Sequence, residues 1–148
     1  MLPLNLPPYE FSVRQGAPPK IFDTIRKKYV ALTPEEWVRQ NFLRYLVVEK
    51  KYPASLIRIE HPLKVYKLQK RCDAVVCDNK GHPLVIVEFK SPDVALNQAV
   101  FDQISRYNIA LKVKYLIVSN GMEHYCCIVD TKSRSCHFLD NIPEYSAL

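Results

Sequence analysis

Three charged residues, Asp73, Glu88 and Lys90, are the part of this 148-residue sequence best suited to chemistry. Glu88 and Lys90 stand two positions apart in "VIVEFKS" (85–91), whose valine and isoleucine residues otherwise predict a buried strand. Because strand side chains alternate between the two faces of a sheet, Glu88 and Lys90 point the same way. Burying such charges costs free energy that their pairing offsets only in part. By themselves, the two residues are typical of an ion pair at the end of a strand.

Asp73 changes this interpretation, because it lies on the strand that precedes Glu88. A tight turn at Asn79-Lys80-Gly81 connects the two strands and places Asp73 and Glu88 within about two residues of cross-strand register. Two carboxylates this close repel each other unless a cation lies between them. Oxygen ligands from Asp73 and Glu88, completed by waters, suit Mg²⁺ or Mn²⁺. Lys90 could then orient a water or stabilise charge that develops on a phosphate.

A glutamine on the following helical segment extends this polar cluster. Gln103 falls at the centre of an apolar helix face, one turn before Tyr107. A buried amide requires hydrogen-bond partners. A glutamine at the edge of the face, bonded to the backbone, is the ordinary alternative. The neighbouring strand carries Asp, Glu and Lys, and this favours Gln103 as a member of the same cluster.

The series Asp73, Glu88-x-Lys90 and Gln103-x-x-x-Tyr107 resembles the PD-(D/E)xK nuclease superfamily, in the branch that carries a Q-x-x-x-Y motif. Within that branch the chain is similar to the N-terminal nuclease domain of type I restriction enzyme R subunits, in a small stand-alone bacterial version. The resemblance covers residues 20 to about 127. It implies an α/β fold that is restriction-endonuclease-like, with a mixed β-sheet core of order αβββαβ flanked by helices. The stretches that carry it are "IFDTIRKKYVALTPEEWVRQNFLRYL" (21–46), "RIE" (58–60), "KRCDAVV" (70–76), "VEFKSP" (87–92), "QISRYN" (103–108) and "YLIVSNG" (115–121).

The resemblance also implies a role for each residue of the motif. Asp73 and Glu88 would bind the metal, which would be Mg²⁺ or Mn²⁺. Lys90 would position the attacking water or help to deprotonate it. Gln103 and Tyr107 would organise the site and contact the DNA backbone.

Related nucleases often add an acidic residue from the first helix or the first strand, and here Glu36 and Glu60 compete for that place. Glu36 has another explanation, because it stands three residues after Thr33 and completes a capping box. Glu60 lies beside His61-Pro62 at an interruption of a strand. The two remain equal alternatives as metal ligands. Basic side chains that could neutralise DNA phosphates are Arg26, Lys27, Lys28, Arg39, Lys67, Lys70, Arg71 and Arg106.

The elements that must position these residues can be predicted from the turn and capping signals. A helix is expected from Thr33, with Pro34 in its first turn, until Tyr52-Pro53. A second helix is expected over 91–111, where Ser-Pro-Asp opens the segment. Because this helix separates the third and fourth strands, at least one strand pair should be parallel. The expected strands cover 55–66, with a break at Pro62, then 71–78, 83–91 and 113–120, followed by a terminal hairpin over 124–131 and 135–140.

The N-terminal region and the overall composition complete the prediction. Residues 1–19, with five prolines, are expected to form an extended arm, residues 21–34 a short helix or a hairpin, and residues 20–148 one nuclease-like domain. Lys and Arg number 21 against 15 Asp and Glu, a net charge of +6 that is compatible with a polyanionic partner such as DNA. No apolar run approaches the roughly 20 residues that cross a bilayer, so no membrane is expected.

The five cysteines are an odd number without a C-x-x-C pair, their spacing fits no standard zinc pattern, and no secretory signal precedes them. Reduced thiols in the cytoplasm are therefore expected. Type I R subunits carry an ATPase motor, but no phosphate-binding motif of that kind occurs among the three glycines here. The prediction is a Mg²⁺-dependent deoxyribonuclease whose partners are DNA, a motor or other nucleic-acid-processing subunit on another chain, and a second copy in a homodimer. The alternative is a catalytically inactive nuclease-fold module that binds nucleic acid or a protein.

Overall fold

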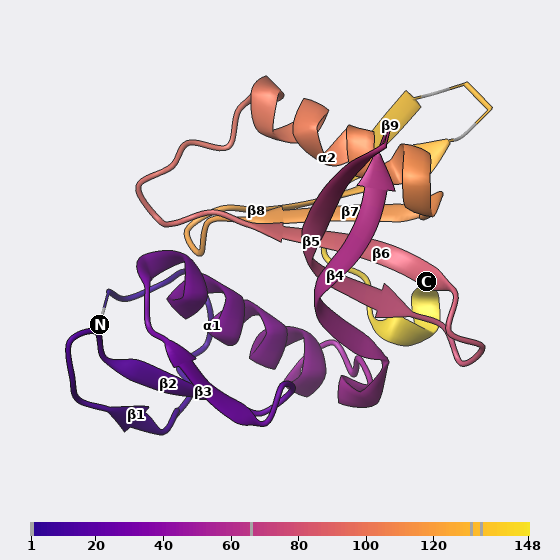
Figure 1. Ribbon diagram of the computed structural model, residues 1–148. Coiled ribbons are helices and arrows are strands. Elements are labelled where there is room, and N and C mark those ends of the chain that lie inside the picture. Colours follow the sequence, from indigo (N-terminus) through magenta and orange to yellow (C-terminus); the bar gives the residue numbers. More distant parts are fainter. Residues whose placement is uncertain (1, 66, 131, 134) are drawn as a thin grey trace.

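The structure, a computed structural model, describes residues 2–65, 67–130, 132–133 and 135–148, with only the backbone of Val65, Leu68, Tyr107, Ile109 and Ala110. Its centre is a six-stranded mixed sheet in the order β4-β5-β6-β7-β8-β9 (Figure 1). The strands are β4 (Ile57–Val65), β5 (Leu68–Cys77), β6 (Pro83–Phe89), β7 (Tyr115–Ser119), β8 (His124–Asp130) and β9 (Ser135–Leu139). Two helices, α1 (Pro34–Val48) and α2 (Gln98–Leu111), pack against opposite faces of this sheet. The succession α1, β4, β5, β6, α2, β7 confirms the predicted αβββαβ core.

A small antiparallel sheet precedes α1 and lies beside it in Figure 1. It consists of β1 (Val13–Arg14), β2 (Lys20–Asp23) and β3 (Lys28–Ala31). Residues 21–34 therefore adopt the hairpin of the two predicted alternatives. The preceding residues attach to the domain through several hydrogen bonds, among them Asn5 N–H to the Gly121 carbonyl (2.8 Å) and the Trp37 indole to the Leu2 carbonyl (2.9 Å).

The start of α1 confirms its predicted cap. The Thr33 hydroxyl accepts a hydrogen bond from the backbone N–H of Glu36 (3.1 Å), and Pro34 is the first helical residue. The reciprocal half of the capping box is absent, because the N–H of Thr33 donates to the Ala31 carbonyl instead. The Glu36 side chain is therefore available for other partners.

The break predicted at Pro62 was wrong, because the structure places it two residues earlier. Pro62 lies inside β4 opposite Arg71, whereas Glu60 adopts a left-handed backbone conformation with φ +52°. β4 is the edge strand of the sheet, so a proline there removes no hydrogen bond from the ladder. A glutamate at positive φ is uncommon and marks a local distortion of the strand.

The predicted start of the second helix was also wrong. α2 begins at Gln98, and the Asn97 side chain caps it by accepting from the N–H of Val100 (3.3 Å). The Ser91 hydroxyl instead bonds to the Asp93 carboxylate (2.6 Å) within a loop that leads to the helix. The crossover through α2 makes β6 and β7 parallel, as predicted.

Alternation along β6 divides the core into two layers. Val85, Val87 and Phe89 pack on the side of α1, while Ile86 packs with Ile104 on the side of α2. The antiparallel pairing of β8 with β9 confirms the predicted terminal hairpin. Two short 3₁₀ helices, η1 (Ala54–Leu56) and η2 (Tyr145–Ala147), complete the fold. Among the described residues, no helix is long and apolar enough to cross a membrane.

Candidate active site

Asp73 and Glu88 lie opposite each other at the end of the β5–β6 ladder. The last regular pair joins Ala74 to Val87, and one further step along both strands brings Asp73 opposite Glu88. Each carboxylate binds the backbone of the other strand: Glu88 Oε1 accepts from the Asp73 N–H (3.2 Å), and Asp73 Oδ2 accepts from the Phe89 N–H (2.7 Å). The predicted cross-strand register of the two carboxylates is therefore confirmed.

The environment of Glu88 disfavours its charged form. The side chain is 5% exposed, and burial raises the pKa of this carboxyl. The charge of Asp73 and a hydrogen bond between the two carboxyl groups raise the pKa further, whereas the Asp73 N–H and the Lys90 ammonium oppose the rise. The pair therefore favours a proton or a cation between its oxygens.

Lys90 and Gln103 lie next to this pair and contact each other. Lys90 follows the last residue of β6, and its backbone N–H donates to the Ser119 carbonyl (2.9 Å), which extends the pairing with β7. Its Nζ donates to Gln103 Oε1 on α2 (3.4 Å). The structure thus brings four of the five predicted catalytic residues together.

Two predictions about α2 have different outcomes. Gln103 is exposed and does not occupy the centre of an apolar face as predicted; the buried anchors of the helix are Val100 and Ile104. Gln103 therefore stands at the edge of the face, with Lys90 as its partner. The predicted role of Tyr107 stays a prediction, because its side chain is outside the described part of the structure.

A third carboxylate, Glu35 in the first turn of α1, was missed by the sequence analysis. Burial raises the pKa of Glu35, and the charge of Asp73 raises it further, while Lys90 and Arg39 lower it. These interactions place the Glu35 carboxylate in the electrostatic field of the Asp73 and Lys90 site. In the sequence, Glu35 is marked only by its position beside Glu36. The rotation of α1 about its axis relative to the sheet decides which of these two glutamates faces the site.

Glu36 lies in a buried ion-pair network. Its Oε1 accepts from Arg26 Nη2 (2.8 Å) and Arg39 Nη2 (3.2 Å), and its Oε2 accepts from Arg39 Nε (3.0 Å) and Gln40 Nε2 (3.1 Å). Arg26 also pairs with the buried Asp23. Both carboxylate oxygens of Glu36 are thus occupied, and the two arginines are committed to this network rather than presented to DNA.

Glu60, the other predicted ligand, lies across β5 from the carboxylate pair. The β4–β5 register places it opposite Asp73, on the side away from Glu88. Its carboxylate is 46% exposed and lies 3.8 Å from Arg26, Arg39 and Arg71. Glu60 thus lies near arginines from three elements, and β5 separates it from Glu88. Its role as a metal ligand stays a prediction, as does that of Glu36.

The donor set at Asp73 and Glu88 fits a hard divalent cation. Asp73 and Glu88 lie close together despite their mutual repulsion, and the Glu35 carboxylate interacts with Asp73. These carboxylates supply the oxygen ligands that Mg²⁺ and Mn²⁺ prefer. Among the described residues, no three His, Cys, Asp or Glu side chains already form a closed metal cage. Such a site would leave positions for water and substrate, as catalytic metal sites do.

Two of the cysteines contact each other, with Cys127 Sγ 3.0 Å from Cys136 Sγ, but among the described residues the cysteines form no metal-binding group. Among the described residues all five are free thiols, and four of them, Cys72, Cys77, Cys126 and Cys127, are buried. His124, which directly precedes Tyr125 and the Cys126-Cys127 pair, uses both ring nitrogens on Ser119 Oγ (2.7 Å) and the Asn5 carbonyl (2.8 Å).

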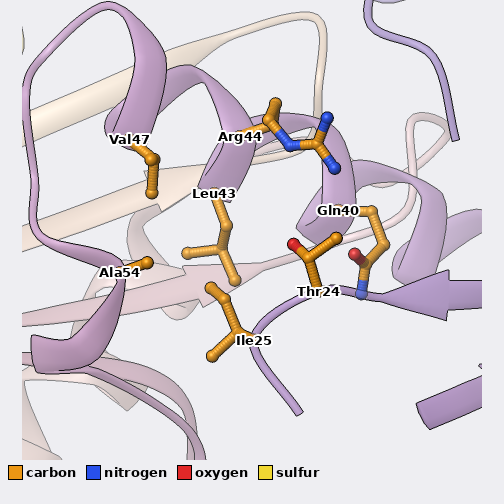
Figure 2. Close-up of a pocket in the computed structure, with 7 residues that line it drawn as sticks. All are labelled: Thr24, Ile25, Gln40, Leu43, Arg44, Val47 and Ala54. Atoms are coloured by element: carbon orange, nitrogen blue, oxygen red, sulfur yellow. The ribbon is translucent and has the colours of Figure 1, made fainter. Parts of the chain in front are cut away.

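A separate pocket lies between α1 and the β2–β3 turn (Figure 2). Thr24 and Ile25 border it on the turn side, and four residues of α1 form its opposite wall. None of the predicted catalytic residues lines this pocket, so the candidate active site is elsewhere. The α1 residues concerned are Gln40, Leu43, Arg44 and Val47, and Ala54 completes the rim.

The solved structures provide a fold comparison. A fragment described as an HsdR subunit of a type I restriction enzyme from Vibrio vulnificus YJ016 superposes with a TM-score of 0.55 at 18% sequence identity. The match covers 76% of this chain and 24% of that one, so the chain corresponds to about a quarter of the length of its structural relative. At this identity the similarity concerns the fold. None of the curated proteins compared with the chain matches it.

A family model described as the type I restriction enzyme R protein N terminus matches residues 34–143. This range begins at the first residue of α1 and contains the whole six-stranded sheet, and with it Asp73, Glu88, Lys90 and Gln103. It is most of the chain. The chain therefore belongs to the type I restriction enzyme R protein N-terminal family.

Proposed function

We propose that this protein is a metal-dependent deoxyribonuclease of the PD-(D/E)xK type, which hydrolyses phosphodiester bonds in DNA. The observation that carries the proposal is the convergence of the Asp73 and Glu88 carboxyl groups beside Lys90. A structural ion pair would need one carboxylate for one lysine. Two carboxylates in contact, one of them buried, repel each other unless a proton or a cation lies between their oxygens.

Asp73 and Glu88 would hold Mg²⁺ or Mn²⁺, and Glu35 is the best-placed further carboxylate. The cation would supply Lewis-acid polarisation of the scissile phosphate and lower the pKa of water. Lys90, held by Gln103, would orient the attacking water and stabilise negative charge on the phosphate oxygens. Gln103 is thus a positioning residue, which fixes the lysine side chain by accepting its hydrogen bond. Glu36 and Glu60 would act through Arg39, since both lie beside it.

The proposed substrate is DNA. The proposed partners are a motor or other nucleic-acid-processing subunit on another chain and a second copy of this chain. The free thiols of the described residues suit the reducing cytoplasm as the compartment.

A cleavage assay on plasmid and single-stranded DNA with Mg²⁺ or Mn²⁺ tests the proposal. Wild type should cut, and Asp73→Ala and Lys90→Ala should each lose at least about 100-fold in rate, because each removes a group of the reacting site. Asp140→Ala and Lys132→Ala are matched controls, since both residues are exposed and lie at the β8–β9 hairpin. Cleavage that survives both site substitutions would overturn the site. Salt-sensitive DNA binding without cleavage on any substrate would favour the inactive module.

A further inference from the structure

The β4–β5 hairpin extends beyond the main sheet as a two-stranded ribbon. Regular pairing of β4 with β5 continues outward from His61–Cys72 to Val65–Leu68. Pairing of β5 with β6 covers only Ala74 to Cys77. The outer half of the hairpin, residues 61–65 and 67–72, therefore projects past β6 as a separate ribbon, named here the basic ribbon. In Figure 1 its end overlaps α2, and β4 contacts that helix.

The basic ribbon carries a concentration of positive charge. Lys64, Lys67, Lys70 and Arg71 are all exposed, and residues 61–72 contain no Asp or Glu. These four residues amount to most of the net charge of +6. Within the described residues, only Arg71 has an acidic partner, Glu60 at 3.8 Å. A solvated face would ordinarily mix the two signs of charge, as other exposed surfaces of proteins do.

The charges lie on both faces of the basic ribbon and at its tip. Residues opposite each other in an antiparallel pair share a face, so Arg71 lies with Pro62 on one face and Lys70 with Leu63 on the other. Lys64 falls on the Arg71 face by alternation along β4. Lys67 is at the turn, with φ +68°. Because the Leu63 face packs toward α2, the Arg71 face and the turn are the parts of the ribbon that DNA can reach, and they carry Arg71, Lys64 and Lys67. This distribution suits contacts with the phosphate backbone at a groove of duplex DNA.

The ribbon is also held in a fixed orientation relative to the candidate active site. Leu63 (8% exposed) and Cys72 (0%) belong to the core layer on the α2 side, and β4 contacts α2. Asp73 follows Cys72 directly. DNA bound along the ribbon would therefore be presented next to the carboxylate pair.

We infer that the basic ribbon is a duplex-DNA-binding arm, which enters a groove and places the phosphate backbone beside Asp73. The inference rests on the proposed function in taking DNA as the substrate. It adds the surface that binds DNA and the form of DNA that is bound. Of the basic residues in the sequence, it selects the ribbon lysines rather than Arg26 and Arg39, whose guanidinium groups bind Glu36.

The test is a binding measurement in EDTA, so that cleavage cannot interfere. The probe is a labelled duplex of about 20 base pairs, roughly two helical turns, followed by fluorescence anisotropy between about 50 and 200 mM salt. The variant K64Q/K67Q/K70Q should bind at least about tenfold more weakly at 0.1 M salt. The slope of log K against log salt should become flatter by up to about 0.9 for each phosphate that the variant no longer neutralises. K64R/K67R/K70R, which keeps the charges, should bind like wild type.

The matched control is K20Q/K51Q/K80Q, which removes three exposed lysines outside the ribbon and leaves the same net charge. It should stay within about twofold of wild type and keep the salt slope. Equal losses in the two triple variants would show a general charge effect and overturn the arm. If K64Q/K67Q/K70Q loses as much affinity for single-stranded DNA as for the duplex, the inference that the ribbon enters a groove of duplex DNA is overturned. If the protein binds DNA through the ribbon but cleaves no substrate, the proposed DNA-binding arm stands and the proposed nuclease activity fails. Failure of the arm can therefore be distinguished from failure of the proposed function.

Discussion

The guanidinium of Arg39 donates a hydrogen bond from Nη1 to the backbone carbonyl of Asp73, at 3.1 Å. This contact ties α1 to β5 at the residue where the β4–β5 ladder is distorted by Glu60. The same guanidinium donates to both carboxylate oxygens of Glu36, and Arg26 of the β2–β3 turn donates to one of them, Oε1. The backbone of Asp73, a proposed metal ligand, is thus held in place by the ion pairs that link Arg26 of the N-terminal hairpin through Glu36 to Arg39.

Arg39→Lys should weaken this fixation while keeping the positive charge. A lysine lacks the planar fork that binds Glu36 and the Asp73 carbonyl together. Unfolding in urea should show a loss of about 1–3 kcal/mol, and cleavage should fall by more than about tenfold at saturating Mg²⁺. Arg44→Lys on the same helix is the control, because Arg44 makes only a long hydrogen bond to the Glu10 carbonyl (3.5 Å) and a contact with the Phe11 ring among the described residues, and binds no carboxylate there. Wild-type activity in a destabilised R39K protein would mean that Arg39 only supports the fold.

Glu35→Gln and Glu36→Gln should have opposite phenotypes. Glu35 lies in the field of Asp73 and Lys90 and is exposed, so E35Q should weaken the response of cleavage to Mg²⁺ and leave stability nearly unchanged. E36Q removes a buried charge from two arginines and should cost about 3–5 kcal/mol. Metal titrations of activity and urea unfolding of both variants check this. A normal Mg²⁺ response in E35Q would exclude Glu35 from the metal site.

Glu88→Gln should stabilise the protein in the absence of metal, and increasingly so at higher pH. The pKa of Glu88 is raised in the folded state, so the folded protein keeps a proton that the unfolded chain has lost above its ordinary value of 4.5. Stability of the wild type should therefore fall as the pH rises from about 5, and glutamine removes this dependence. At about pH 8 the gain should reach at least about 1 kcal/mol, or roughly 2–4 °C in Tm.

Thermal unfolding with and without Mg²⁺ checks this prediction. Mg²⁺ should raise the Tm of the wild type, because a ligand that binds only the folded state stabilises it. The Tm of E88Q should respond much less. Parallel curves of Tm against pH for the two proteins would show that Glu88 is ordinarily ionised and would contradict the prediction.

Ile104→Ala should loosen α2 and with it the partner of Lys90. Ile104 is 1% exposed and packs in the core layer on the α2 side, one residue after Gln103. Truncation should cost about 2–5 kcal/mol, as for other buried isoleucines. Ser105→Ala, exposed on the same helix, should stay within about 0.5 kcal/mol. Similar urea midpoints for the two variants would contradict the assigned anchor.

The register of Asp73 with Glu88 was predictable to within about two residues from the turn at Asn79-Lys80-Gly81, where Gly81 adopts the positive φ (+84°) that such turns favour. A register shift between Val76 and Cys77 then sets the observed pairing. A bulge of this kind is not encoded in the turn residues or in the apolar alternation.

The remaining parts of the site depend on long-range packing, which local patterns do not encode. Ser91 and Asn97 are both good helix caps, and the loop conformation selects the second. Glu35 and Glu36 differ by 100° around α1, so a choice between them requires the position of the helix against the sheet. The exposure of Gln103 likewise depends on the angle at which α2 crosses β6.

The N-terminal arm has a consequence for the order in which the protein folds. Asn5 makes three hydrogen bonds to the β7–β8 region, to the Gly121 carbonyl, the Met122 carbonyl and His124, across separations of 116, 117 and 119 residues. The arm is synthesised well before these partners, which lie more than 110 residues further along the chain. The N-terminal arm can therefore dock only after β7 and β8 have formed. Contacts between residues this far apart in the sequence are slow to form. Completion of this edge of the domain is a late event in folding, after the β5–β6 hairpin that carries Asp73 and Glu88.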